Sequence, residues 1–366
     1  VLASASPRRR EILERAGFCF EIDVAGVEEL QCPGESALHA TIRLALEKAD
    51  AVVGRRHPGE VVLGADTTVV VEEMMMGKPI DRAQAVDYLL MLAGRNHLVY
   101  TGWALLAAGG CIEACNAVFN GKVDNAYALV RPCGHHAEAD RGRGFCIFSN
   151  IAIAIRDLLS TQKVSRVAVV DWDVHHGNGT ESAFYAEANI LTISLHEDSL
   201  YPYNSGSLHD CGDGVGHGFN INIPLPPGSG GGAYNSAMER VVLPALELFQ
   251  PEFILVASGL DGSTWDPLGH MMLLSTHYKS MTEQLLDAAD RYCEGRLVVC
   301  HEGGYSAGYV PFCGAGIIEA LAGEDSGIID PFAKYESKWQ ALQANQDEMI
   351  KEVESVALGA LRDAFK

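Results

Sequence analysis

The chain has 366 residues, of which 48% are hydrophobic and 20% are charged, a composition that is ordinary for a globular protein. The formal net charge of −21 argues against nucleic-acid binding as the main activity, because such proteins carry basic patches. No apolar run approaches the roughly 20 residues that span a bilayer, and no signal-peptide pattern opens the chain.

The first 101 residues begin with small and hydroxyl-bearing residues, Ala3 to Ser6, and continue into three arginines. Backbone N–H groups, hydroxyls and arginines at a strand-to-helix turn suit phosphate, but for this stretch taken alone a helix start with a solvated basic face is the favoured explanation. Downstream, the pattern predicts a helix over Ala37–Val53, strands on both sides of the Gly64–Ala65 turn, a helix over Asp81–Leu92 and a strand over His97–Thr101.

Four motifs in this stretch, SASPRR, GADT, GKP and GRNHLVYTG, resemble those of the Maf family of nucleoside triphosphate pyrophosphatases. The resemblance covers only the first half of that family's domain. It implies an α/β segment in which Glu29 and Asp66 bind Mg²⁺, and in which cations neutralise the charge on the leaving pyrophosphate. The residues that it assigns to the triphosphate are Ser4, Arg8, Arg9 and Lys78.

From residue 104 onward, apolar strands alternate with helices, which predicts a parallel sheet with helices on both faces. The predicted strands are Tyr127–Val130, Val167–Val170, Ile190–Leu195, Phe219–Ile223, Phe253–Ser258 and Arg296–Cys300. The predicted helices cover 104–121, Ile147–Leu159, Tyr234–Phe249 and most of Ala333–Lys366. The last of these is amphipathic and suits packing or an oligomer surface.

Polar residues follow four of these strands at the carboxyl edge, where ligands bind in open α/β sheets. Asp173 and His175 are two residues apart, so an extended stretch points both to one face, as two of three ligands of a catalytic zinc site. Asp261, at the end of its own strand, is the best third ligand, and Asp266 is its rival.

The other two strand ends carry groups suited to proton transfer and substrate polarisation. His135 and His136 are adjacent and suit an acid/base pair, and Tyr305 follows a glycine pair on a loop. Any one of these residues alone would be explained by a surface or core role. Because all of them are predicted to lie at the same edge of the sheet, a catalytic site is the favoured interpretation.

The motifs RPxGHHA, GFCIFSN, DWDVHHGNGT, SLH, SGLDGSTWDPLG and EGGY together resemble the histone deacetylase superfamily, in the form of its class II and bacterial amidohydrolase members. The resemblance covers about residues 104–330. It implies an arginase-like α/β fold and zinc-dependent hydrolysis of acyl-lysine or related acyl-amides. The implied zinc ligands are Asp173, His175 and Asp261.

The same resemblance assigns roles to the surrounding residues. His135 and His136 form the acid/base pair, Asp171 supports His135, Asn178 supports His136, and Tyr305 donates to the oxyanion. Phe145 and Tyr203 line an acyl tunnel, and Leu268 stands where polyamine-selective members carry an acidic residue. A structural potassium ion is implied at Asp171, Asp173, His175, Ser194 and Leu195. Cys133 replaces the second proline of the usual RPPGHH motif.

We therefore expect a Maf-like partial domain over 1–101 and a deacetylase-like domain over 102–366 that lacks its usual front segment. The expected activity is zinc-dependent deacylation in the cytoplasm, where cysteines without disulfide spacing stay reduced. The alternatives are a nucleotide pyrophosphatase, an inactive fusion or scaffold, and a dimanganese arginase relative, which would need more bridging carboxylates. The expected partners are acyl-lysine peptides or small acyl-amides, with neither nucleic acid nor membrane, and a homo-oligomer is compatible.

Overall fold

The computed structural model describes residues 2–4, 6, 10, 21–27, 37–53, 55, 66–71, 74–76, 84, 88, 98–102, 104–161, 164–335 and 340–366. The chain divides into an N-terminal unit, Val1–Leu105, and a C-terminal unit, Leu106–Lys366. None of the helices in these ranges combines the length and apolar composition that a membrane crossing requires.

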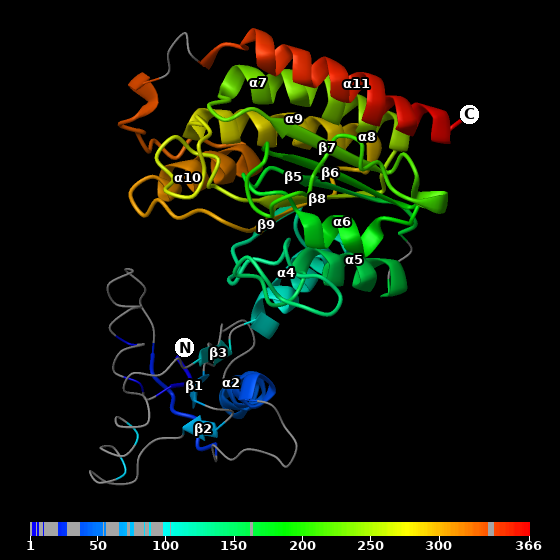
Figure 1. The fold of residues 1–366 in the computed structure, drawn as a ribbon. Helices are drawn as coiled ribbons and strands as arrows, with labels where there is room; N and C mark the ends of the chain where they lie inside the picture. Colours follow the sequence, from blue (N-terminus) through cyan, green and yellow to red (C-terminus); the bar gives the residue numbers. More distant parts are fainter. Residues whose placement is uncertain are drawn as a thin grey trace. The chain divides into compact units, whose positions relative to one another are not determined.

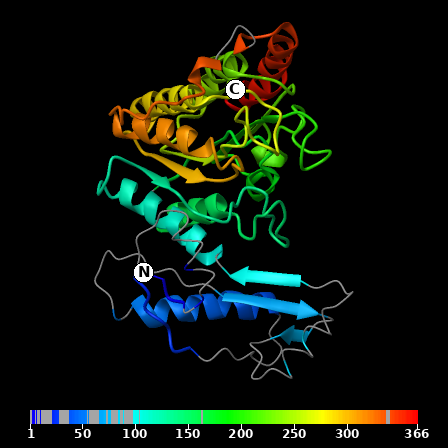
Figure 2. The ribbon, with the colours of Figure 1, turned by 90° about the vertical axis from the view of Figure 1, so that its left-hand side faces the viewer.

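The N-terminal unit contains a small antiparallel sheet in the order β2 (Met74–Met76), β1 (Asp66–Val71), β3 (Leu98–Gly102). Helix α2 (Ala37–Val53) packs against β1 and β3 (Figure 2). Ala49 and Val52 of this helix form a small core with Ala3. The predicted helix over Ala37–Val53 is therefore confirmed, while most of the predicted helix over 81–92 lies outside the described residues.

A six-stranded, all-parallel sheet forms the centre of the C-terminal unit (Figure 1). In spatial order its strands are β4 (Asn125–Ala128), β9 (Leu297–His301), β8 (Phe253–Ser258), β5 (Val167–Asp171), β6 (Ile190–Glu197) and β7 (Asn220–Leu225). The α/β fold with a parallel sheet, predicted from the alternation of strands and helices, is confirmed.

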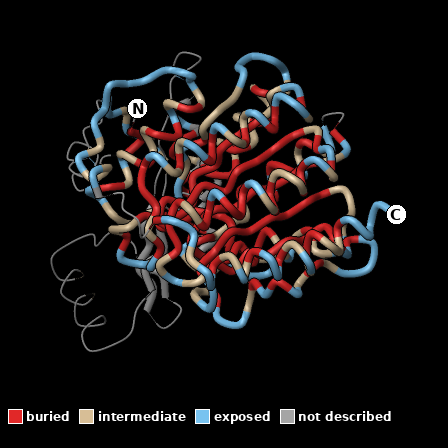
Figure 3. Tube along the Cα trace, turned by 90° about the horizontal axis from the view of Figure 1, so that it is seen from above, coloured by how far each residue is buried: buried red, intermediate tan, exposed pale blue. Residues whose placement is uncertain are grey.

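Each central strand is buried on both faces, which explains the continuous apolar runs in the sequence (Figure 3). Ala168 and Val170 of β5 point into one core, and Val167 and Val169 point into the other. One core is covered by α7 (Gly231–Ala237), α8 (Leu243–Phe249), α9 (Ser275–Tyr292), α10 (Val310–Ala322) and α11 (Ala344–Ala364). The other is covered by α4 (Ala104–Phe119), α5 (Asn150–Thr161) and α6 (Asn178–Phe184).

Several predicted boundaries are corrected by the structure. The first strand of this sheet begins at Asn125 and ends at Ala128, so Leu129 and Val130 belong to the following loop. The predicted helix over Tyr234–Phe249 is α7 and α8 joined by a π-helical turn, Met238–Val242, with the same face buried throughout. Helix α11 packs on the core through Ile350 and Val353.

Candidate metal centre and active site

Four loops meet at the carboxyl edge of the parallel sheet, each following one strand. They follow β4, β5, β8 and β9, which are neighbours in the sheet. The loop after β5 does not continue as an extended segment, because the chain bends over residues 173–175. Asp173 and His175 nevertheless lie together, since Asp173 Oδ1 accepts from the His175 backbone N–H at 2.9 Å and lies 3.0 Å from His175 Nδ1.

Asp173, His175 and Asp261 form a buried group whose ligand atoms lie within 4.8 Å of one another. His175 Nδ1 lies 3.0 Å from Asp173 Oδ1 and 3.2 Å from Asp261 Oδ2. Each carboxylate is also held by the backbone, Asp173 Oδ2 by Gly303 N–H at 2.8 Å and Asp261 Oδ1 by Val174 N–H at 2.9 Å. The three side chains are therefore fixed independently of any bound ion.

This group fits a divalent cation. Asp261 Oδ2 is buried and accepts no hydrogen bond with good geometry from the described residues. Burial and the neighbouring Asp173 charge raise the pKa of Asp261, as expected for two buried carboxylates that lie close together. Side chains at Gly259 or Gly303 would collide with these carboxylates, because a Cβ there would lie 2.2 Å or 2.1 Å from a carboxylate oxygen. Imidazole and carboxylate groups are zinc ligands, and catalytic zinc sites have three protein ligands with the fourth position left for water or substrate.

His135 and His136 lie side by side in the loop after β4, with ring centroids 4.0 Å apart. His135 Nδ1 lies 2.9 Å from Asp171 Oδ2, and His136 Nδ1 lies 2.9 Å from Asn178 Oδ1. The Asn178 amide is oriented by its own Nδ2, which donates to Glu138 Oε1 at 2.7 Å. Its oxygen therefore faces His136, so His136 Nδ1 is the protonated nitrogen in the neutral ring.

The pKa values of the two histidines are shifted in opposite directions because their partners differ. Burial lowers the pKa of His136 to about 2, and its neutral asparagine partner offers little compensation. Burial alone would also lower the pKa of His135, but the carboxylates of Asp173 and Asp171 outweigh it and hold that pKa well above the ordinary value. Two adjacent rings with opposite protonation preferences are suited to proton transfer.

Tyr305 follows β9 and is held in place by Asp266. Asp266 Oδ2 accepts from the backbone N–H groups of Tyr305 at 2.6 Å and Ser306 at 3.1 Å. Asp266 therefore uses its carboxylate to bind the Tyr305 loop. It is not part of the Asp173–His175–Asp261 group, for which it was the rival third ligand. Burial, Asp173 and Asp261 raise the pKa of Tyr305, which keeps its hydroxyl protonated and able to donate.

The aromatic residues near the entrance differ in part from the sequence-based expectation. The Phe145 ring is 70% exposed and lies 5.8 Å from the Tyr305 ring. Tyr203, expected in the tunnel, is 77% exposed and lines a separate surface pocket over residues 198–209. Tyr201 instead contacts the site, with its ring centroid 5.0 Å from that of His136. Leu268 is 40% exposed and its backbone N–H donates to Asp266 Oδ1.

Glu302 is a buried residue of the site that sequence reasoning missed. Its Oε2 accepts from the backbone N–H groups of Gly134 at 2.6 Å and His135 at 3.0 Å, so it fixes the loop that carries both histidines. A charged residue directly after the buried strand β9 was the available signal. His176, which was given no ligand role, is buried between Ser205 at 3.0 Å and Glu181 at 3.2 Å.

The residues assigned to potassium lie on the neighbouring strands β5 and β6 and on the loop after β5. Asp171 pairs with Ser194 in the strand register, and Leu195 follows within β6. Ser194 Oγ lies 3.0 Å from His196 Nδ1. The strand register and the backbone hydrogen bonds of the loop after β5 place these residues near one another.

Few of the residues assigned to the phosphate site fall in the described part of the N-terminal unit. Ser4 is buried, and its Oγ accepts from the Ser6 backbone N–H at 3.3 Å. Asp66 is the first residue of β1 and pairs with Gly102 in the strand register. The remaining residues, Arg8, Arg9, Glu29 and Lys78, lie outside the described residues.

A parallel α/β sheet with polar loops at its carboxyl edge and a buried Asp–His–Asp group defines an arginase/deacetylase-like architecture. The family model described as the histone deacetylase domain matches residues 96–321, and the chain belongs to this family. A second model, described as a Maf-like protein, matches residues 1–125, so the two matches overlap at β3 and α4.

Individual relatives agree with the family match. A histone deacetylase-like amidohydrolase of Pseudomonas aeruginosa is 49% identical over 69% of this chain and 67% of its own length. A probable deacetylase of Archaeoglobus fulgidus is 44% identical over 62% of this chain and 64% of its own length. A crystal structure of the HDA15 HD domain is similar with a TM-score of 0.64 and 32% identity, over 72% of this chain and 69% of that one. The chain thus spans about two thirds of the length of these relatives.

Proposed function

We propose that the chain is a zinc-dependent deacylase that removes acetyl or related acyl groups from acyl-lysine or similar linear amides. The observation that carries this proposal is the convergence of the Asp173–His175–Asp261 group with His136 and Tyr305 at one edge of the sheet. The names of the relatives support the same class of reaction.

Asp173, His175 and Asp261 would hold the zinc ion, which when bound polarises an amide carbonyl and lowers the pKa of a coordinated water. The proton transfers of the reaction are carried out by side chains of the protein. His136 carries its proton on Nδ1, facing Asn178, so its Nε2 lone pair can accept a proton from the attacking water. The same nitrogen can return that proton to the amine as the carbon–nitrogen bond breaks.

Tyr305 stabilises developing negative charge, and His135 helps to position His136. The Tyr305 hydroxyl stays protonated and can donate to the oxygen that gains negative charge when water adds to the carbonyl. His135 is fixed by Asp171 at 2.9 Å, which limits how far the adjacent His136 ring can move. We also propose that Asp171, Asp173, His175, Ser194 and Leu195 hold a structural potassium ion, as the resemblance implies.

An assay on the full purified chain tests this proposal. It would be offered an acetyl-lysine fluorogenic peptide and, separately, nucleoside triphosphates, each with and without a zinc chelator. We expect acetate release that the chelator abolishes and added zinc restores. Pyrophosphate release that needs only Mg²⁺, without acetate release, would overturn the proposal in favour of the Maf-like activity, and neither activity would leave a scaffold role.

His175→Ala and His176→Ala provide a matched pair of variants. The two histidines are adjacent and both are buried, but only His175 contacts the two aspartates. We expect His175→Ala to lose bound zinc and acetate release together. His176→Ala should keep its zinc, because its partners are Ser205 and Glu181.

A further inference from the structure

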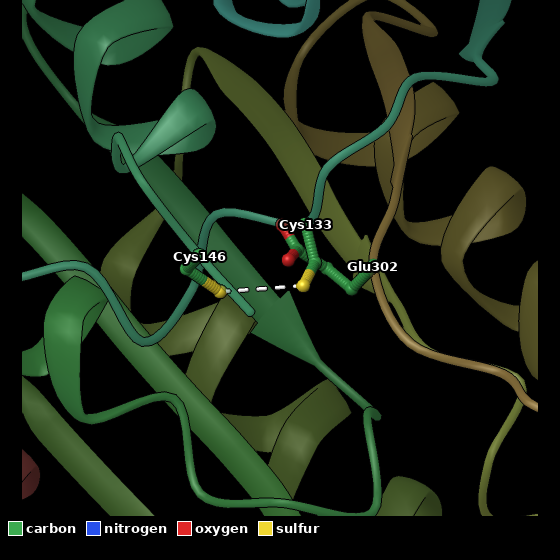
Figure 4. A group of neighbouring side chains, drawn as sticks. All are labelled: Cys133, Cys146 and Glu302. Atoms are coloured by element: carbon green, nitrogen blue, oxygen red, sulfur yellow. Dashed lines mark hydrogen bonds between the residues drawn. The ribbon is translucent and has the colours of Figure 1, made fainter. Parts of the chain in front are cut away.

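Two cysteines of the loop between β4 and α5 lie in direct contact. Cys133 and Cys146 are 4% and 3% exposed, and the Cys146 thiol donates a hydrogen bond to Cys133 Sγ across 3.4 Å (Figure 4). Both are free thiols. The proposed hydrolysis uses neither sulfur, and Cys133 stands where the related motif has a proline.

The surroundings of the pair favour reaction between the two sulfurs. Both lie near one carbonyl, Gly144 O, at 3.6 Å from Cys133 and 3.5 Å from Cys146. The hydrogen bond from Cys146 lowers the pKa of Cys133, whereas burial raises that of Cys146. Cys133 is therefore the thiol that more readily forms a thiolate, and Cys146 is positioned to react with it next.

We propose that Cys133 and Cys146 are a redox modification site, at which a peroxide converts the two thiols into a reversible disulfide. The Cys133 thiolate attacks the peroxide oxygen, forming a sulfenic acid and releasing one water. Cys146 sulfur then attacks the Cys133 sulfur, the S–S bond forms and the sulfenic oxygen leaves as a second water. One hydrogen peroxide is reduced and two thiols are oxidised, and a dithiol reductant reverses the reaction.

The bond would connect two parts of the candidate active site. Cys133 is two residues before His135, and Cys146 directly follows Phe145. The His136 backbone N–H donates to Cys146 Sγ at 3.4 Å, so movement of that sulfur is transmitted to His136. Forming the bond brings the sulfurs closer by more than about 1 Å, which is enough to misplace a catalytic group.

The backbone between Cys133 and Cys146 packs so closely on His136 that a small movement of this segment would shift the histidine. Gly144 and Phe145 both adopt positive φ angles, 56° and 66°, and a Cβ at Gly144 would lie 2.2 Å from the His136 ring. The segment between the two cysteines is therefore packed tightly against the histidine. We expect the oxidised form to hydrolyse acyl-amides at least about tenfold more slowly than the reduced form.

Disulfide mapping on the full chain tests the proposal. The reduced protein is treated with hydrogen peroxide, blocked with an alkylating agent and digested without reductant for mass spectrometry. We expect a peptide cross-linked between Cys133 and Cys146 that is 2 Da lighter than the sum of its thiol forms and disappears with dithiothreitol. Absence of this peptide, or only sulfinic and sulfonic acids at Cys146, would overturn the proposal.

Variants separate this site from other cysteines and from a metal site. Cys133→Ser and Cys146→Ala should remove the cross-link, whereas Cys115→Ala, a buried cysteine of α4, should retain it. Because Glu302 completes a possible ligand group with the two sulfurs, zinc content is measured in the reduced proteins. A second zinc equivalent that Cys133→Ser and Cys146→Ala both lose and Cys115→Ala keeps would overturn the redox assignment in favour of a metal site.

The cross-link is measured without reference to catalysis, so its outcome is independent of the proposed deacylase function. Only the activity readout rests on that function. We expect peroxide to slow the wild-type chain and Cys115→Ala, and dithiothreitol to restore both, while Cys133→Ser is unaffected by peroxide. A cross-link that forms fully without changing the acetate-release rate would contradict the coupling to the active site.

Discussion

The two units of the chain carry their polar motif residues on different kinds of sheet, one parallel and one antiparallel. In the C-terminal unit, Asp173 and Asp261 are buried and each accepts a backbone hydrogen bond that fixes its carboxylate. In the N-terminal unit, Asp66 begins β1 of an antiparallel sheet, and Ser4 Oγ accepts a hydrogen bond from the Ser6 backbone N–H. Catalytic side chains work only when neighbouring bonds hold them in place, and the loops after the parallel strands supply such bonds to Asp173 and Asp261.

This contrast predicts that amide hydrolysis depends on the C-terminal unit, with the largest effect at the candidate metal group. Asp261→Asn keeps the shape of the side chain and removes one of two negative charges. We expect zinc to be lost and kcat/KM for an acetyl-lysine peptide to fall about 1000-fold or more. The measurements are metal content by mass spectrometry and steady-state kinetics.

Asp266→Asn is the control for this change, because Asp266 bonds to backbone N–H groups and lies outside the metal group. It should keep its zinc, although the Tyr305 loop is weakened. Full zinc content in Asp261→Asn would contradict the ligand assignment.

Tyr305→Phe gives the next largest expected effect. It removes one hydroxyl donor and leaves the ring that packs near Phe145. We expect kcat to fall about 100-fold, which corresponds to about 3 kcal/mol, with little change in KM. Tyr203→Phe, on an exposed side chain, should change kcat less than about twofold. Near-wild-type turnover in Tyr305→Phe would exclude its role at the oxyanion.

The sheet was predictable from the sequence because its strands are buried on both faces. The run Phe253–Ser258 is apolar over its whole length and ends before Gly259, so its bounds are those of β8. The π-helical turn at Met238–Val242 left no signal, because the residues before and after it still bury one face.

Side chains that act through the backbone were harder to predict. Asp261 and Asp266 both follow β8, and only the fold shows that Asp266 bonds to the Tyr305 loop. Tyr201 and Tyr203 are two residues apart in an irregular loop, where spacing does not determine which ring faces His136. Residue types in the sequence were enough to predict the kind of chemistry. Which of two nearby residues of the same type enters the site depends on loop geometry, which the sequence does not give.

A smaller effect is expected on stability at Glu302. Burial raises the pKa of this carboxyl from 4.5 to about 8 in the folded protein. Between these values the unfolded chain releases its proton while the folded chain keeps it, so unfolding becomes easier as pH rises. Stability from this group is complete below about pH 4.5 and is lost by about pH 8.

Glu302→Gln removes the titration and keeps an oxygen for the N–H groups of Gly134 and His135. We expect its unfolding free energy to change less with pH than that of the wild type, by about 1–3 kcal/mol between pH 4.5 and 8. Chemical denaturation at several pH values measures this difference. Parallel curves for the two proteins would contradict it.

The smallest effect is expected at Asp66, which the Maf resemblance assigns to Mg²⁺ together with Glu29. It stands at the start of β1, in the unit that contributes none of the Asp173, His175 and Asp261 ligands. Asp66→Asn should change acetate release less than about twofold, since amide hydrolysis is assigned entirely to the loops after β4, β5, β8 and β9. The same preparation is assayed with nucleoside triphosphates. A pyrophosphatase activity that Asp66→Asn abolishes would show that both units work independently, whereas loss of acetate release would show that the site needs the N-terminal unit.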